Sequence, residues 1–322
     1  MPDTEVRAAL EALDLFEGLP PAVVDRLATA GHPFSLAAGE YLFHEGDPGD
    51  SISLLATGSL EAHLRLPGGR ELEIVPLVPG ALIGEMAVLS ERPRRFSVRA
   101  SEDSEGWSFS VADIGRLGAT EQPEVARRFG RLALERLRAQ YTRLGDLCSG
   151  DPRAAGTARP AELDAAEPVA EVQAEPGETA YLETVLFFSR FSAAEIEELF
   201  GDLRRLEAPR GAAVVPESAL LIVMRGAVET SIRRGGLAAR ARLAGPGRIV
   251  GHLNLLGEDE TAATSRAREH SILLEVPVER VAQIIDRGDE TGRRFGWAAY
   301  ADVVDALFEA QRPISRMAAA GG

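Results

Sequence analysis

The sequence contains no lysine, so all 35 of its basic residues are arginines. This absence excludes sites that depend on a lysine amine, such as Walker A loops, Schiff-base lysines, the kinase strand lysine and Ser-Lys catalytic pairs. The single cysteine, Cys148, excludes an intramolecular disulfide, and the five scattered histidines show no zinc-ligand spacing. There is no run of roughly 18 apolar residues and no signal-peptide pattern, so we expect a cytoplasmic protein without membrane insertion.

Positive charge is also scarce. The 50 acidic residues outnumber the 35 basic ones, which gives a formal net charge of −15 at pH 7. Proteins that bind nucleic acid need a basic surface, and anionic membranes attract basic segments. We therefore expect neither a nucleic acid nor a membrane surface as a partner.

The chain is long enough for two domains. At roughly 150 residues per domain, 322 residues give two domains that can each bury a core. Residues 149–178 are rich in Ala, Pro, Glu and Gly and have few large apolar side chains. Such a segment cannot bury enough surface to order itself, so it is predicted to be a flexible acidic linker. The predicted domains are then residues 1–148 and 179–322.

The two halves repeat one pattern. Each has a short helix with a paired apolar motif, an amphipathic helix, several short β-branched segments punctuated by glycine, and a long amphipathic helix. The matching positions are Phe16 and Phe188, Leu19 and Phe191, Gly39 and Gly211, Gly58 and Gly226, Gly80 and Gly247, Gly84 and Gly251, and Ala100 and Ala267. The offset falls from 172 to 168 and then to 167 residues, so the second copy is slightly shorter.

Short apolar segments separated by turn residues predict β-strands in the first copy. They are Tyr41–Phe43, Ser53–Leu55, Leu60–Leu66, Leu72–Leu77, Phe96–Val98 and Trp107–Phe109. Pro67–Gly69 is a hairpin signal, and glycines 39, 46, 49, 58, 80 and 84 are predicted to occupy tight turns that need a positive φ. This pattern favours a mainly β fold, a small barrel or jelly roll, with helices at both ends.

One set of spacings in the first copy is specific. The motif residues are Gly39-Glu40, Phe43, Glu45-Gly46-Asp47, Gly58, Pro79-Gly80, Gly84-Glu85-Met86-Ala87 and Pro93-Arg94. Over residues 10–146 this pattern resembles the cyclic nucleotide-binding domain family, in which an arginine follows nine residues after the glutamate of a Gly-Glu pair. Residues 182–310 fit the same frame. The resemblance implies two tandem β-jelly-roll barrels of the catabolite activator and protein kinase A regulatory subunit type, each with N-terminal and C-terminal helices.

The residues after the Pro-Gly turn suit an anion. A helix that begins at Gly84 would present free backbone N–H groups, and Arg94 can add a charge-assisted contact to phosphate. Ionised Glu85 accepts hydrogen bonds only, which suits a hydroxyl. The resemblance assigns Glu85 to the ribose 2′-hydroxyl and Arg94 to the cyclic phosphate; the alternative is an Arg-Glu ion pair on the barrel rim. The candidate ligand-binding residues are Gly84, Glu85, Met86, Ala87, Arg94, Arg95 and Phe96.

Both copies depart from the family's pattern. Arg95 and Phe96 stand where the family usually has small residues, so Arg95 either adds positive charge or crowds the site together with Phe96. Position 95 has no hydroxyl group that would favour a guanine base, so the resemblance implies cAMP rather than cGMP. In the second copy His252 and Thr261 replace the glutamate and the arginine. We expect this copy to be degenerate and retained for contacts.

A long helix is predicted over Pro123–Leu147. Leu134, Leu137, Tyr141, Leu144 and Cys148 recur at intervals of three and four residues, the spacing of a coiled-coil seam. The seam could join two copies in a homodimer through residues 134–148, or it could pack on its own barrel. In relatives the helix after the barrel carries the signal, and Tyr141 or a neighbour could cap the nucleotide base.

The resemblance implies a cyclic-nucleotide-sensing regulatory protein. The first domain would bind cAMP and relay binding through its C-terminal helix to an unidentified protein partner. No helix-turn-helix follows that helix, and no nucleophile-base pair or metal cluster can be assembled, so we expect no DNA-binding output, cofactor, metal site or enzymatic activity. The alternative is a scaffold of two degenerate barrels that binds no ligand.

Overall fold

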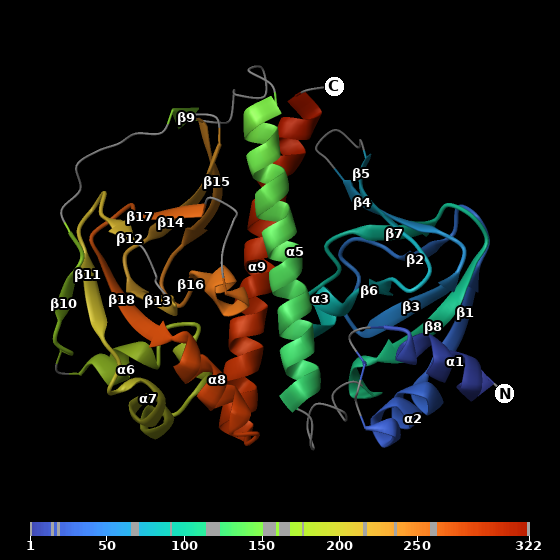
Figure 1. Cartoon of the computed structure of the whole chain (residues 1–322), viewed down its shortest axis with the longest axis horizontal. Helices are drawn as coiled ribbons and strands as arrows, with labels where there is room; N and C mark the ends of the chain where they lie inside the picture. The colour runs from blue at the N-terminus through green and yellow to red at the C-terminus, as the bar shows by residue number, and fades with distance from the viewer. Residues whose placement is uncertain are drawn as a thin grey trace. The chain divides into compact units, whose positions relative to one another are not determined.

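The computed structural model describes residues 2–13, 16–17, 20–65, 71–90, 92–113, 123–150, 159–160, 168–175, 177–214, 218–234, 237–257 and 263–320. The chain divides into two compact units, Met1–Phe129 and Gly130–Gly322 (Figure 1). The boundary therefore lies inside the long predicted helix, about 20 residues before the predicted end of the first domain. No described helix is long and apolar enough to cross a membrane.

Unit 1 is a β-jelly-roll barrel with helices before it and within it. Its helices are α1 (Pro2–Glu11), α2 (Pro21–Ala30) and α3 (Glu85–Leu89). Its strands are β1 (His32–Leu36), β2 (Tyr41–Phe43), β3 (Ser51–Thr57), β4 (Leu60–Arg65), β5 (Glu71–Leu77), β6 (Leu82–Ile83), β7 (Ser97–Ala100) and β8 (Ser104–Ser110). They form two antiparallel sheets of order β1-β8-β3-β6 and β2-β7-β4-β5. The inward side chains of both sheets, among them Leu55, Leu60 and Val98, make the barrel core.

Unit 2 repeats this architecture. Its helices are the larger part of α5 (Pro123–Gly150), then α6 (Glu178–Leu182), η2 (Phe188–Arg190), α7 (Ala193–Phe200), η3 (His252–Leu256), α8 (Val278–Asp286) and α9 (Glu290–Ala320). Its strands are β9 (Arg159–Pro160), β10 (Ala170–Val172), β11 (Arg205–Ala208), β12 (Ala213–Val214), β13 (Ala219–Arg225), β14 (Val228–Arg234), β15 (Leu237–Ala244), β16 (Ile249–Val250), β17 (Ala263–Ala267) and β18 (Ser271–Pro277). The sheet orders are β10-β11-β18-β13-β16 and β12-β17-β14-β15-β9.

The strand orders confirm the internal repeat. β11-β18-β13-β16 reproduces β1-β8-β3-β6, and β12-β17-β14-β15 reproduces β2-β7-β4-β5. The six strands predicted in the first copy all fall on observed strands. β1 escaped prediction because none of its five residues is fully buried, so it shows no inward apolar pattern. The predicted hairpin at Pro67–Gly69 lies outside the described residues.

Five of the six predicted turn glycines have a positive φ, between 84° and 92°: Gly39, Gly46, Gly58, Gly80 and Gly84. Gly49 differs, because its φ is not positive. A Cβ at Gly49 would overlap the carbonyl oxygen of Arg92 and lie 2.8 Å from the Ala87 Cβ. Glycine is needed there for close approach of two loops, not for its backbone conformation.

The predicted flexible linker, residues 149–178, is partly built into unit 2. Within its described residues, β10 pairs with β11 at one sheet edge, and β9 pairs with β15 at the edge of the other sheet. Edge strands gain backbone hydrogen bonds without needing large apolar side chains. The prediction weighed side-chain burial alone, and it missed this source of order for a segment poor in apolar residues.

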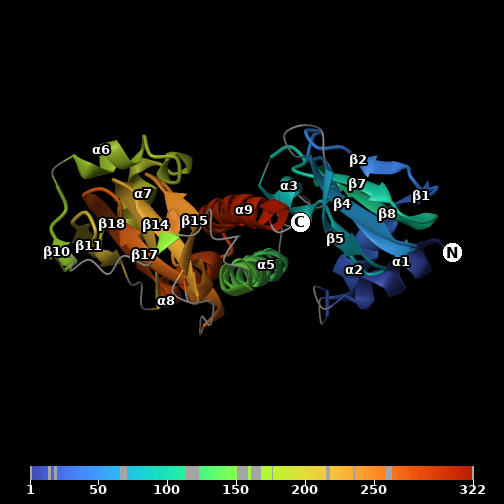
Figure 2. The ribbon, with the colours of Figure 1, turned by 90° about the horizontal axis from the view of Figure 1, so that it is seen from above.

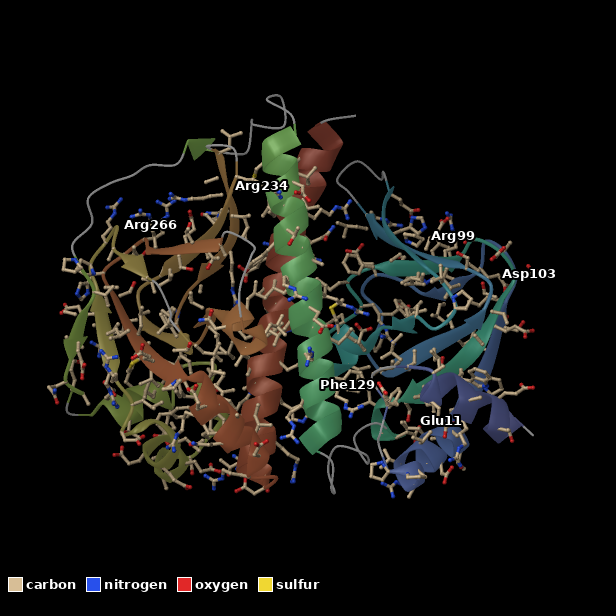
Figure 3. The ribbon with its side chains drawn as sticks, in the orientation of Figure 1. Glu11, Arg99, Asp103, Phe129, Arg234 and Arg266 are labelled. Atoms are coloured by element: carbon tan, nitrogen blue, oxygen red, sulfur yellow. The ribbon has the colours of Figure 1, made fainter. Side chains whose placement is uncertain are left out.

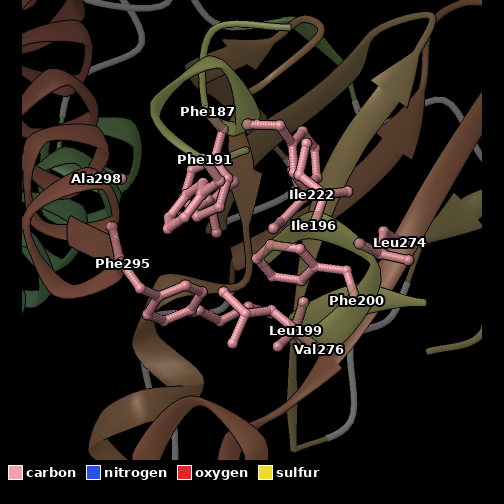
Figure 4. Close-up of a cluster of buried hydrophobic side chains, with 14 of the residues drawn as sticks. Phe187, Phe191, Ile196, Leu199, Phe200, Ile222, Leu274, Val276, Phe295 and Ala298 are labelled. Carbon is pink, nitrogen blue, oxygen red and sulfur yellow. The ribbon is translucent and has the colours of Figure 1, made fainter. Parts of the chain in front are cut away.

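A cluster of aromatic side chains joins the helices of unit 2 to one sheet. Phe187, Phe191, Phe200 of α7 and Phe295 of α9 lie together (Figure 4), and three of their ring pairs meet edge to face with centroids 5.8 to 6.3 Å apart. The paired apolar motif of the second copy thus anchors its N-terminal helices to the helix that follows the barrel. In the first copy Phe16 is buried, while Leu15 and Leu19 lie outside the described residues.

The apolar seam of α5 lies in unit 2. Leu134, Leu137, Tyr141, Leu144 and Cys148 are all buried within the single chain. In two perpendicular views α5 runs alongside α9 (Figures 1 and 2). The seam therefore packs within unit 2, where Leu137 and Tyr141 border the same cavity as Arg242 and Ile249. A homodimer through residues 134–148 would have to displace these contacts.

Candidate functional site

Two loops of unit 1 meet beside the start of α3. The Arg94 N–H donates to Asp47 O, and the Gly46 N–H donates to Arg94 O, both at 2.8 Å. The Arg92 N–H donates to Ala87 O at 3.0 Å. These backbone bonds hold residues 44–51 against residues 84–94, so both halves of the predicted motif lie side by side.

Gly84 opens α3 in a left-handed conformation, with φ 85° and ψ 1°. A Cβ at this position would overlap Nη1 of Arg94 and lie 3.3 Å from Ser51 O. Glycine therefore serves two needs here, because it adopts the turn without strain and leaves room for the arginine.

Arg94 is the best-buried cation of this site, with 3 % of its surface exposed. Its Nη1 donates to Gly84 O at 2.9 Å, and its Nη2 donates to Ser51 O at 2.7 Å and to Ser51 Oγ at 3.0 Å. The guanidinium carbon lies 4.2 Å from the centre of the Phe43 ring. Burial lowers the pKa of Arg94, while Asp50 and Asp47 act in the opposite direction.

One donor of Arg94 is left over. Its Nε–H is buried and has no hydrogen-bond partner among the described residues. The nearest carboxylate, Asp50, is 3.6 Å from Nη2 and mostly exposed, so it compensates the buried charge only weakly. A buried cation with an unused donor is suited to an anion that brings its own oxygens.

The other candidate residues divide into buried and exposed groups. Glu85 is 2 % exposed, Ala87 is buried, and Met86 is half-buried. Arg95 is exposed. Phe96 is half-buried and packs against the barrel core that includes Leu55 and Val98. Glu85 and Arg94 thus lie inside the fold, and the alternative of an ion pair on the barrel rim does not describe them.

Two contacts of Arg94 were absent from the sequence prediction. Ser51 supplies both a carbonyl and a hydroxyl, and Phe43 supplies the ring face. Phe43 was predicted only as a strand residue of the motif, and Ser51 carried no signal, because a single serine at the start of a strand is common. Tyr141, which the sequence suggests as a cap for the nucleotide base, lines a cavity of unit 2.

In the second copy the position of Glu85 is taken by His252, which belongs to a buried ionic network. His252 Nε2 lies 2.8 Å from a carboxylate oxygen of Asp302 on α9, and Arg242 Nη2 donates to the other oxygen at 2.8 Å. The Ile249 N–H donates to Asp302 at 3.0 Å, and Arg248 contacts it as well. This copy therefore neutralises its buried cation with a carboxylate of its own chain.

The pKa shifts of this network have clear causes. Burial raises the pKa of Asp302, but Arg242 and His252 outweigh it and hold that pKa below its ordinary value. Burial lowers the pKa of His252, so its imidazole is neutral near pH 7. Thr261, the counterpart of Arg94, lies outside the described residues.

Comparison with known families gives two matching regions. The profile described as "Cyclic nucleotide-binding domain" matches residues 33–121 and 212–288. Each match falls within one of the two barrels. The regions coincide with the two copies of the internal repeat.

Several curated proteins are similar in sequence. "Acetyltransferase Pat" of Mycolicibacterium smegmatis is 34 % identical over 141 residues, 43 % of this chain and 41 % of that protein. The "CRP-like cAMP-activated global transcriptional regulator" of Mycobacterium tuberculosis is 27 % identical over 137 residues, 42 % of this chain and 61 % of that protein. The chain thus spans less than two thirds of the length of either relative.

A fungal relative and a solved structure extend the comparison. The "cAMP-dependent protein kinase regulatory subunit" of Emericella nidulans is 37 % identical over 111 residues, 34 % of this chain and 25 % of that protein. Among solved structures, the regulatory domain of Toxoplasma gondii PKA with cAMP is 17 % identical, with a TM-score of 0.35 over 87 % of this chain and 91 % of that one.

Proposed function

The chain belongs to the cyclic nucleotide-binding domain family, and on that premise we propose that it is a cytoplasmic regulatory protein that senses cAMP through its first barrel. Binding would be relayed through α5, the helix that follows this barrel, to a separate protein partner. The chain would supply neither catalysis nor DNA binding itself. Its net charge of −15 opposes binding to nucleic acid.

The observation that carries the proposal is the buried guanidinium of Arg94 with its unpartnered Nε–H. A cyclic phosphate has one negative charge and exocyclic oxygens that accept hydrogen bonds. It would compensate the charge of Arg94 and use the remaining donor. Glu85 would accept a hydrogen bond from the ribose 2′-hydroxyl, while backbone N–H groups of Met86 and Ala87 would face the phosphate.

Arg95 and Phe96 affect whether a nucleotide fits the first barrel and which base it carries. Arg95 is exposed and would add positive charge near the entrance, while Phe96 packs toward the barrel core. Position 95 offers no hydroxyl to a guanine base, which supports cAMP over cGMP. The named regulatory relatives from Mycobacterium tuberculosis and Emericella nidulans are both described by cAMP, which supports the same choice.

Signal transfer follows from differential affinity. If cAMP binds more tightly to one arrangement of α5 than to another, each tenfold difference in affinity shifts the equilibrium by about 1.4 kcal/mol. A partner that recognises one arrangement would then sense the nucleotide. Neither step requires a catalytic residue.

Calorimetric titration with cAMP, cGMP and the non-cyclic nucleotide AMP tests the proposal. The wild-type chain should bind cAMP at one site, and Arg94→Ala should weaken that binding by roughly 100-fold or more, because a buried charged contact is lost. Arg65→Ala is the matched control, since Arg65 is an exposed arginine at the end of β4. If a folded wild-type chain gives no heat with cAMP or cGMP, the first barrel is not a nucleotide sensor and the scaffold hypothesis takes its place.

A further inference from the structure

His252 differs from the other charged side chains of the buried ionic network, because an imidazole in water changes its charge between about pH 5 and 8. It stands at the start of η3 and exposes 5 % of its surface. Its Nε2 lies 2.8 Å from Oδ2 of Asp302. Since an ionised carboxylate only accepts hydrogen bonds, Nε2 carries the proton and donates to Asp302.

Three elements of unit 2 meet at this contact. Asp302 belongs to α9, Arg242 to β15 and His252 to η3. Arg242 donates through Nη2 to Oδ1 of Asp302 at 2.8 Å, and its Nη1 lies 3.3 Å from Nε2 of His252. We call these three side chains the buried triad. Their contacts hold the helix that follows the second barrel against two elements of that barrel.

The carboxylates that the structure describes around the triad each pair with an arginine. Asp302 accepts from both Arg242 and Arg248. Asp305 pairs with Arg248, and Glu309 lies 3.8 Å from Nε of Arg242. The negative charges of this region are therefore already matched by guanidinium groups.

The cavity that His252 borders has a positively charged wall. Its titratable lining residues are Tyr141, Arg233, Arg242, His252 and Arg266. Figure 3 labels Arg266 on the second barrel. No aspartate or glutamate is among the described lining residues. A second proton on His252 would therefore add a cation next to three arginines.

The pKa of His252 agrees with this arrangement. Burial has the largest effect and lowers the pKa; the hydrogen bond to Asp302 raises it, and the charge of Arg242 lowers it again. In water the ordinary value is about 6.5. The folded triad thus binds the proton less readily than a state in which the imidazole is hydrated. The stability that neutral His252 gives is complete above about pH 6.5 and is lost progressively as the pH falls toward the lowered pKa.

The triad is a feature of the second barrel and not of the shared fold. The first barrel has other residues at the matching positions: Val75 for Arg242, Ala81 for Arg248 and Glu85 for His252. The ionic contact to the helix after the barrel therefore depends on side chains that the repeat does not require.

We propose that the buried triad is a proton-sensitive contact, which keeps α9 on the second barrel at neutral pH and releases it under mildly acidic conditions. Protonation of His252 favours an open state, in which η3 and α9 have separated and water hydrates the imidazolium. The contact involves no nucleotide, so it is independent of cAMP binding by the first barrel.

Hydrogen exchange of the α9 amides of residues 299–306 tests the proposal in the full-length chain without nucleotide. The protection factor is the intrinsic exchange rate divided by the observed rate, so the ordinary pH dependence of exchange cancels. Between pH 7.5 and 5.5 this factor should fall about three- to tenfold, because the open state binds one proton more than the closed state. His252→Gln should abolish the fall, since the glutamine amide can donate to Asp302 but does not titrate.

His270→Gln is the matched control. His270 also belongs to unit 2, but it is exposed and lies 2.6 Å from Glu207, so its variant should keep the wild-type fall in protection. Circular dichroism at pH 7.5 checks that both variants are folded. The proposal is overturned if the wild-type chain keeps its protection down to pH 5.5, or if all three chains lose protection equally.

An NMR titration of the imidazole signals does not require His252→Gln to fold. The chain has five histidines, so the His252 signal is the one that remains in each single His→Gln variant of the other four. It should titrate below pH 6.5 in the folded chain, and a value of 6.5 or above overturns the proposal. A first barrel that binds no cAMP would leave both the exchange and the NMR results unchanged.

Discussion

Gly84 and Arg94 depend on each other at the start of α3. The guanidinium occupies the space that a side chain at position 84 would need, and it donates to the carbonyl of the same residue. The nine-residue interval between Glu85 and Arg94 allowed the sequence to predict that these residues share a site. It could not predict Ser51 as a partner, because that contact joins positions 43 residues apart through the barrel closure.

Gly84→Ala should destabilise unit 1 more than the same change at another left-handed glycine. Gly39 has a φ of 90° and no atom within 4 Å of an added Cβ, so Gly39→Ala carries the backbone strain alone, about 1 kcal/mol. Gly84→Ala adds an overlap with Arg94, and we expect at least about 1 kcal/mol more. Denaturant unfolding followed by fluorescence measures both. Equal unfolding midpoints would show that the close packing of Gly84 against Arg94 is unimportant.

At the scale of elements, Asp302 of α9 contacts several parts of the second barrel through one carboxylate. Asp302 accepts from the β16 backbone, from Arg242 on β15 and from Arg248, and it contacts His252 at the start of η3. Arg242 and Asp302 are 60 residues apart. The sequence predicted a long helix after the second barrel and the replacement of the binding-site arginine by Thr261. It gave no indication that Asp302 on that helix would compensate the buried charge of Arg242.

Asp302→Asn should cost unit 2 roughly 3 to 5 kcal/mol, because it leaves Arg242 buried without its counter-charge. Glu309→Gln is the matched control. Glu309 is 3.8 Å from Arg242 and about a third exposed, so its loss should cost less than about 1 kcal/mol. Thermal or denaturant unfolding of both variants gives the comparison. Similar losses for the two would contradict the central role of Asp302.

Protonation of Asp302 should lower the free energy of unfolding of unit 2 at acidic pH. The folded pKa of Asp302 is lowered from its ordinary value of about 3.9, so the folded state binds the proton less readily than the unfolded chain. Its stabilising effect is therefore complete above that ordinary value and is lost progressively as the pH falls toward the lowered pKa. Asp302→Asn should flatten the decrease in unfolding midpoint below about pH 4. An unchanged slope would assign the acid sensitivity to other groups.

At the scale of the whole chain, turn and strand patterns with the repeat spacing predicted a small barrel or jelly roll in each half, and they located six of the eight described strands of the first barrel. They located the domain boundary differently from the structure. The shift to Ala, Pro and Glu after residue 148 is clear in the sequence, but the boundary follows the apolar seam of α5, which packs in unit 2. The periodicity of a helix shows which face is apolar and does not show which neighbour covers it.

Removing α5 should therefore destabilise the second barrel. A fragment of residues 130–322 should unfold at a higher denaturant concentration than a fragment of residues 151–322, which lacks the seam. Leu137 and Leu144 are fully buried, and three further seam residues are nearly so. Burial of five such side chains stabilises by roughly 5 kcal/mol or more, even after allowance for a compact unfolded state. Identical midpoints would mean that α5 is dispensable for unit 2.

The alkylation rate of Cys148, the buried thiol on α5, measures how often that helix opens. Cys148 is 3 % exposed, and burial raises the pKa of its thiol, so both access and ionisation oppose alkylation in the closed state. Since the chain has one cysteine, every modified molecule is modified at Cys148. The labelling rate with a small maleimide, divided by the rate for the unfolded chain, then gives the fraction of time that α5 is detached. A ligand that stabilises the packed position of the helix slows the reaction in proportion.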